Sequence, residues 1–381
     1  HDYILASLGG LLIAVASTTN LLLKGRVTGF SGILYELWSG NEGNNTWRWA
    51  LILGLFSSSS ILRLASLENE TFFENQENFS EDFSIPAIII SGLFVGFGTK
   101  VGNGCTSGHG VCGLPRFSPR SFVAVAFFLS FGIGIATIKH HFPFFSGSSF
   151  LSEWGVHMYE DSDSAANLYY SSFLGLTLLI SLIYIVMCYK QEYFKENSRG
   201  FSDAFVGYIV GLIFGIGLCV SGMTKRSKII NFLAISSDWD ASLMFVLGAS
   251  VGINLITFYY ILKKTETPLF SNKPLTLKTN WNINSDLILG PSLFGIGWGM
   301  SGLCPGPVMV NLFLYLPILA FFTVCIILGQ IIAKVYLSYM KEPEKINALQ
   351  EISDVDGINK SELKEISKRD RSDLGKEDLN L

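Results

Sequence analysis

Long apolar segments, separated by short polar ones, make up most of the chain. A helix that spans a lipid bilayer needs about 20 mostly apolar residues. Stretches without a charged residue run Tyr3–Leu23, Ser121–Ile138, Ser164–Tyr189, Ala204–Thr224 and Ala241–Leu262. Leu287–Ala333 is long enough for two spans, and the shorter Trp49–Leu62 and Phe83–Thr99 fit spans with charged ends. The pattern predicts an all-α, polytopic membrane protein with about nine spans.

Composition excludes the main classes of soluble protein. Hydrophobic residues make up 49% of the 381 residues and charged residues only 15%, whereas soluble domains carry about 25% charged residues. The net charge is -4 and no basic face stands out, which argues against nucleic-acid binding. We expect an integral, multi-pass protein, and the sequence does not distinguish a plasma membrane from an organelle inner membrane.

Charge is concentrated at the carboxyl end. Residues 341–381 contain 19 of the 58 charged residues, and we expect a charged soluble tail there. The tail is a possible surface for a protein partner, although a solvated helix or a disordered segment is the simpler explanation.

An internal repeat divides the apolar part. Gly96-Phe97-Gly98 lies as far before Cys105 as Gly295-Ile296-Gly297 lies before Cys304, at an offset of 199 residues. The segment that begins at Gly10 matches the segment that begins at Gly211, at an offset of 201 residues.

These offsets predict two transmembrane repeats, 1–195 and 200–340. We count five spans between equivalent points, and an odd number places the copies in opposite orientations. Inverted repeats are typical of transporters, whose binding sites lie near the midplane where Gly- and Pro-broken helices meet.

Two glycine-rich cysteine loops are the candidate site. Glycine recurs through 96–115, and Pro305 and Pro307 break the second loop, so neither forms an ordinary helix. A broken backbone at membrane depth lines a wet cavity or lies inside protein, and its free N–H groups suit an anion. A thiol adds a soft, polarizable contact.

The candidate substrate-binding residues are Cys105, Cys304, Lys100, Asn103, Thr106, Ser107, His109, Cys112 and Ser301. Each also has a structural reading: the cysteines as packing in a tight turn, His109 as a histidine held by backbone carbonyls, and the others as helix caps or interface anchors. The spacing of His, Cys, Asp and Glu indicates no metal site, and we expect no cofactor.

The two loops resemble the YeeE/YedE family of sulfur-transport membrane proteins. The resemblance rests on the 104–110 motif Gly-Cys-Thr-Ser-Gly-His-Gly and on Leu-Cys-Pro-Gly-Pro at 303–307, and it covers about residues 3–338. Residues 212–224 resemble the second of two short proteins into which bacteria often split this fold. The resemblance implies thiosulfate uptake, with Cys105 and Cys304 passing the ion along through S–H contacts.

One departure concerns a third cysteine. Thiosulfate importers of this family carry one in the amino-terminal loop, whereas Gly25–Gly32 has none. Cys112 or Cys219 is a candidate replacement, and the alternative is a different sulfur species as substrate.

The sequence therefore predicts a permease, not an enzyme, for a small sulfur-containing anion. Two alternatives stay open. One is a transporter-derived structural subunit of a larger, possibly mitochondrial, membrane complex. The other is a membrane sulfurtransferase that holds a persulfide on Cys105, with His109 as its base.

Overall fold

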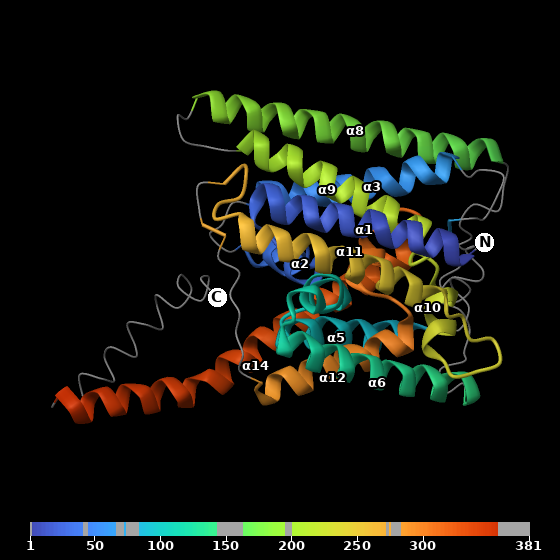
Figure 1. Cartoon of the computed structure of the whole chain (residues 1–381). Coiled ribbons are helices and arrows are strands. Elements are labelled where there is room, and N and C mark those ends of the chain that lie inside the picture. Colours follow the sequence, from blue (N-terminus) through green and yellow to red (C-terminus); the bar gives the residue numbers. More distant parts are fainter. Residues whose placement is uncertain are drawn as a thin grey trace.

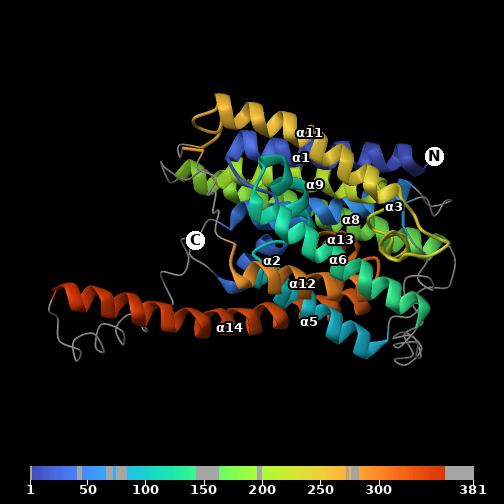
Figure 2. The same cartoon turned by 60° about the horizontal axis from the view of Figure 1, so that its bottom comes forward.

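The chain forms a bundle of long helices that run in similar directions (Figures 1 and 2). The structure is a computed structural model and describes residues 2–40, 45–65, 72–73, 84–142, 163–194, 200–271, 274–275 and 283–356. Every regular element within these ranges is a helix. The predicted all-α membrane fold is confirmed.

One arrangement occurs four times: a long helix, a break, a short helix and a second long helix. The first copy is α1 (Asp2–Lys24), α2 (Phe30–Ser39) and α3 (Thr46–Ala65). The second is α5 (Ile85–Val101), η1 (Thr106–Gly113) with η2 (Leu114–Arg116), and α6 (Pro119–His141). The third is α9 (Gly200–Val220), α10 (Arg226–Leu233) and α11 (Ser242–Lys264). The fourth is α12 (Ser285–Ser301), α13 (Pro305–Asn311) and α14 (Leu316–Asp356), and α8 (Asp163–Phe194) stands outside the pattern.

Each break contains a residue in the left-handed conformation, which stops the preceding helix. The φ angles are 68° at Gly25, 76° at Gly222, 69° at Gly302 and 57° at Asn103. Glycine adopts this conformation without strain, and asparagine tolerates it better than most residues. The backbone is then extended at the residue before each short helix: Gly29, Cys105, Lys225 and Cys304.

The helices pack in two related sets. α1 lies between α9 and α11, and α9 lies between α1 and α3. In the other set, α12 lies between α5 and α6, and α5 lies between α12 and α14. If the first copy is exchanged with the third and the second with the fourth, the same helix neighbours result in both sets. The backbones approach closely at glycines, as Gly211 does against Leu51 and Gly96 against Ile326.

α1 and α9 run antiparallel. Lys24 at the end of α1 contacts Asp203 at the start of α9, while Gly9 near the start of α1 packs against Ser221 beyond the end of α9. An inverted relation between the copies requires this direction. The division into 1–195 and 200–340 remains a prediction that the packing supports.

The count of spans differs slightly from the expected nine. The described residues contain seven helices long and apolar enough to cross a membrane, or eight if α5 and η1–η2, bent by 44°, form one broken span. The difference is α3, a 20-residue helix at an expected position whose apolar character is interrupted by Arg48, Arg63 and the serines 57–60. Seven to eight apolar helices make the chain an integral, multi-pass membrane protein.

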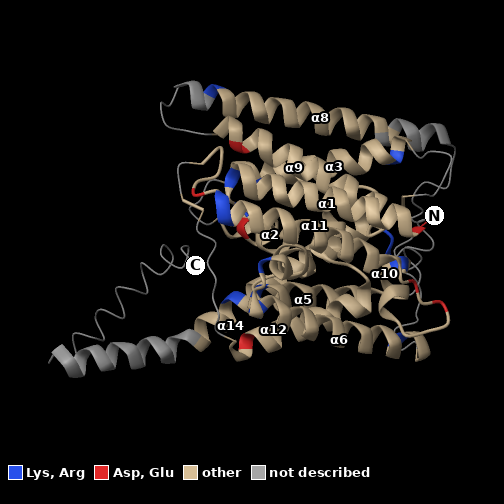
Figure 3. Ribbon diagram, viewed as in Figure 1, with Lys and Arg blue, Asp and Glu red and all other residues tan. Residues whose placement is uncertain are grey.

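Charged residues gather mostly toward the two ends of the helices, and their middle parts are largely uncharged (Figure 3). α14 continues past Met340, the end of its apolar part, to Asp356. The rest of the predicted tail, 357–381, lies outside the described residues, and so does its proposed role in partner binding.

Candidate functional site

Two thiols meet where broken helices converge. Cys105 is the residue before η1 and Cys304 is the residue before α13, and their side chains are 0% and 3% exposed. The two thiol groups lie within interaction distance of each other. Thr106 Oγ1 lies 3.1 Å from Cys304 Sγ, and the Gly306 backbone also lies near that sulfur. The loops that the repeat identified therefore form one site.

The beginning of α2 completes the site. The Phe30 N–H donates to Ser107 Oγ at 3.2 Å, and Ser107 Oγ lies 3.3 Å from Cys105 Sγ. Ser31, the second residue of α2, also lies within interaction distance of the Cys105 sulfur. The first turn of a helix carries partial positive charge, because its N–H groups have no partners within the helix. The thiol pair thus lies among polar donors inside an apolar bundle.

A cavity of about 640 Å³ leads toward this pair from the end of the bundle where α5 ends and α3 and α12 begin. We call it the vestibule. Its wall includes Gly29, Ser31, Gly104 and Gly108, of which Ser31 contacts Cys105 and Gly104 precedes it in the chain. The wall of the vestibule therefore includes the residue next to Cys105 in the chain.

The wall of the vestibule is net positive. Its charged side chains are the cations Arg48, Lys100, Arg116 and Arg120 and the anions Glu36 and Asp286. Charges of one sign along a cleft with apolar surroundings raise the local concentration of the opposite ion.

Three predicted residues also lie on this wall: Lys100, Asn103 and His109. The Lys100 ammonium lies 3.4 Å from the centroid of the Tyr35 ring. The ring nitrogens of His109 lie 3.2 Å from Ser121 Oγ and 3.1 Å from the Gly102 carbonyl oxygen. Both nitrogens are engaged within the protein, which fits the structural reading of this histidine.

Two predicted residues lie apart from both the vestibule wall and the polar group around the thiols. Cys112 packs in a separate apolar cluster with Leu21, Phe258 and Ile261, and its sulfur is 3.9 Å from the Thr28 carbonyl oxygen. Ser301 is fully buried, donates to the Gly297 carbonyl and accepts from the Leu303 N–H in the turn before Cys304. Their contacts are those of residues that hold the loops.

Ser31 and Arg48 are site residues that the sequence analysis did not identify. Ser31 falls inside Gly25–Gly32, the stretch in which the third cysteine was missing. The structure brings a hydroxyl from that stretch to Cys105. The position of Ser31 in this loop was the signal from which it could have been identified.

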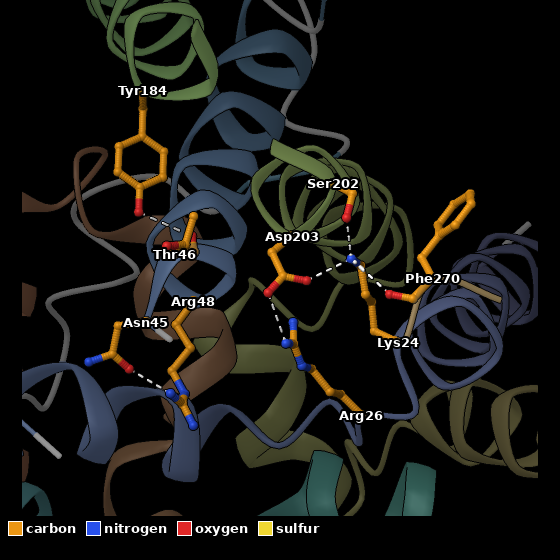
Figure 4. Close-up of polar contacts among 9 residues, drawn as sticks. All are labelled: Lys24, Arg26, Asn45, Thr46, Arg48, Tyr184, Ser202, Asp203 and Phe270. Atoms are coloured by element: carbon orange, nitrogen blue, oxygen red, sulfur yellow. Dashed lines mark hydrogen bonds and ion pairs between the residues drawn. The ribbon is translucent and has the colours of Figure 1, made fainter. Parts of the chain in front are cut away.

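A buried ion cluster fixes the chain just before α2 (Figure 4). Asp203 on α9 binds Lys24 Nζ at 2.6 Å and Arg26 at 3.0 Å, and its side chain is 7% exposed. Lys24 also donates to Ser202 Oγ at 2.7 Å. The Arg26 and Arg48 guanidinium groups each lie 5.0 Å from the centroid of the Trp47 ring. Trp47 and Arg48 lie on the wall of the vestibule. The cluster links the loop of one half to a helix of the other.

Two family models match separate parts of the chain. Residues 3–135 match the family described as sulphur transport, and residues 203–345 match a family of unknown function (DUF6691). The two matches are separated between the second and the third copy of the repeated helix arrangement. No solved structure matches the chain.

Similar proteins include two from Xylella fastidiosa, each called a probable transporter. One is 40% identical over 136 residues, which are 36% of this chain and 94% of the relative. The other is 32% identical over 128 residues, which are 33% of this chain and 85% of the relative. The chain belongs to the sulphur transport family, together with these two probable transporters.

Proposed function

We propose that the chain carries a small sulfur-containing anion across the membrane, with thiosulfate as the first candidate, and leaves the anion chemically unchanged. The observation that supports this best is the close approach of Cys105 and Cys304 beside a net-positive vestibule. One thiol comes from each proposed half, and the pair lies at the breaks where transporters hold their substrates.

The vestibule would serve to concentrate the anion. Arg48, Lys100, Arg116 and Arg120 outnumber Glu36 and Asp286 on its wall, so the local potential favours entry of an anion. The cations also offset part of the cost of removing an anion from water, which is large for a multiply charged ion.

The thiol pair would form the narrow step. An S–H group is a weak donor, and sulfur is polarizable, so contacts with a sulfur-containing anion are favourable without being strong. Conduction requires binding strong enough to admit the ion and weak enough to release it. Ser31, Thr106 and Ser107 supply hydroxyl donors around the pair.

Uptake of radiolabelled thiosulfate into liposomes that contain the purified protein tests this function. We expect Cys105→Ala to remove most of the flux, because it deletes a thiol from the narrow step. Cys188→Ala is the matched control, since Cys188 packs on α8 against Ala50 and Ala204. Flux through the Cys105→Ala variant equal to that of the unaltered protein would reject the mechanism.

Competition identifies the substrate. Unlabelled thiosulfate should suppress the labelled uptake more effectively than sulfate or selenite at the same concentration. Stronger suppression by another sulfur species would assign the substrate to that species, and no uptake by the folded protein would contradict transport.

A further inference from the structure

Gln330 on α14 is a fully buried amide within the apolar part of that helix. Both ends of the amide are used. Its Oε1 accepts from the Trp38 indole N–H at 2.7 Å, and its Nε2 donates to the Ser31 carbonyl oxygen at 3.2 Å. An amide in a membrane span is costly unless its hydrogen bonds are complete. The two contacts of Gln330 reduce that cost, and both join the amide to α2.

The two bonds hold α2 along most of its length. Ser31 and Trp38 are the second and ninth residues of this ten-residue helix. Residues seven apart lie on the same face two turns apart, and a long side chain on a helix points back toward the amino terminus. The Gln330 amide can therefore bond both turns and restrain α2 against rotation and translation.

The orientation of α2 matters because its first turn touches the thiol site. The Phe30 N–H donates to Ser107 Oγ, which lies 3.3 Å from Cys105 Sγ, and Ser31 lies within interaction distance of the same sulfur. Gly29, Gly32, Tyr35 and Glu36 from the same segment line the vestibule. A shift of α2 would therefore move the wall of the vestibule and, at the same time, expose Cys105.

We infer that Gln330 is a positioning residue that holds the first turn of α2 over Cys105 and thereby sets the width of the narrow step. The inference rests on the proposed function for its effect on flux. Its effect on the exposure of Cys105 follows from the contacts of α2 and does not depend on which ion is carried.

The test compares Gln330→Leu with the unaltered protein in liposomes. Each sample is treated with iodoacetamide, and the rate of alkylation at each cysteine is read by mass spectrometry. Loss of two hydrogen bonds should release α2, so we expect Cys105 to react about tenfold faster. Maximal flux of the anion should fall, because the hydroxyl of Ser31 no longer lies at the thiol.

Two controls separate positioning from general loosening. Cys325 lies on α14 itself, packs against Gly92 of α5, and should react at an unchanged rate in the same sample. Thr323→Val removes a hydroxyl from α14 that bonds only to the Leu319 carbonyl of its own helix among the bonds described, and it should behave as the unaltered protein.

An unchanged Cys105 rate in Gln330→Leu, or equal acceleration at Cys105 and Cys325, would overturn the inference. If Gln330→Leu does not fold, Trp38→Phe removes one of the two bonds and keeps an aromatic ring, and it should raise the Cys105 rate by a smaller factor. A faster Cys105 rate in a protein that carries no sulfur anion would uphold the positioning role and reject the proposed function.

Discussion

Ser31 places a hydroxyl beside the thiol pair. It belongs to Gly25–Gly32, the stretch that lacks the cysteine expected from the resemblance to thiosulfate importers. Ser31 lies within interaction distance of the Cys105 sulfur. A hydroxyl is a stronger hydrogen-bond donor than a thiol, and it is less polarizable.

We expect Ser31→Ala to lower thiosulfate flux about fivefold, because it removes one hydrogen bond at the narrow step. Ser31→Cys should retain more of the flux than Ser31→Ala, since a thiol can replace the contact. Liposome uptake measures both variants. The control is Ser7→Ala, because the Ser7 hydroxyl bonds the Tyr3 carbonyl of α1. Equal flux for Ser31→Ala and the unaltered protein would remove Ser31 from the site.

Arg48 lies on the wall of the vestibule, and a change at this single residue tests whether the wall attracts the anion by its charge. Loss of its charge should raise the KM for the anion about threefold at low ionic strength and leave the maximal rate unchanged, because the charge acts on entry. The effect should shrink at 0.1 M salt or above, where surface charges are screened over about 10 Å. Uptake by Arg48→Gln at several salt concentrations measures this.

Arg63→Gln is the matched control for Arg48, since Arg63 lies near the opposite end of the same helix, α3. It should leave the KM unchanged. A rise in KM for Arg48→Gln that does not depend on salt would contradict the role in electrostatic attraction.

At the scale of elements, α1 carries an ion pair at each end, one with α9 and one with α10. Asp203 starts α9 and pairs with Lys24, and Asp2 starts α1 and pairs with Lys228 at 3.1 Å. The two aspartates stand 201 residues apart, the same offset as Gly10 and Gly211. Their surroundings differ, because the Asp203 side chain is 7% exposed and the Asp2 side chain is 68% exposed.

This difference predicts unequal effects on stability. Asp203→Asn leaves the buried Lys24 without its carboxylate and should lower the free energy of unfolding by about 3–5 kcal/mol. Asp2→Asn breaks an exposed pair and should cost roughly 0–1 kcal/mol. Thermal unfolding of both variants in one detergent compares them. Similar losses of stability would mean that burial of the Asp203 cluster contributes nothing.

The sequence predicted most of the helices and the breaks that matter for the site. Apolar length located each long helix, and the prolines and glycines near Cys304 located the turn between α12 and α13. The positions of Ser31 and Gln330 could not be read in the same way. Ser31 meets Cys105 and Gln330 meets Ser31 across long separations in the chain, and such contacts arise only from packing of whole helices.

The fourfold arrangement was also beyond the sequence analysis. The offsets near 200 relate the first copy to the third and the second to the fourth, because those segments share glycine patterns. The structure adds a relation between the first copy and the fourth, seen in the helix order and in the left-handed residues at the breaks. Backbone geometry preserves this relation where side chains differ.

At the scale of the whole molecule, both sets of packed helices join the two proposed halves. α1 needs α9 and α11 as neighbours, and α5 needs α12 and α14. The thiol pair likewise takes one cysteine from each half. Neither half alone contains a complete site or a complete set of helix neighbours.

The pairing of Lys24 with Asp203 also has a consequence for biosynthesis. Asp203 is made about 180 residues after Lys24, which at a ribosomal rate of roughly 5–20 residues per second is a delay of about 10–40 s. During that interval the nascent amino-terminal helices must wait in the membrane with a cation that has not yet met its carboxylate. A version of this protein divided into two polypeptides could become stable only when the separately inserted pieces find each other.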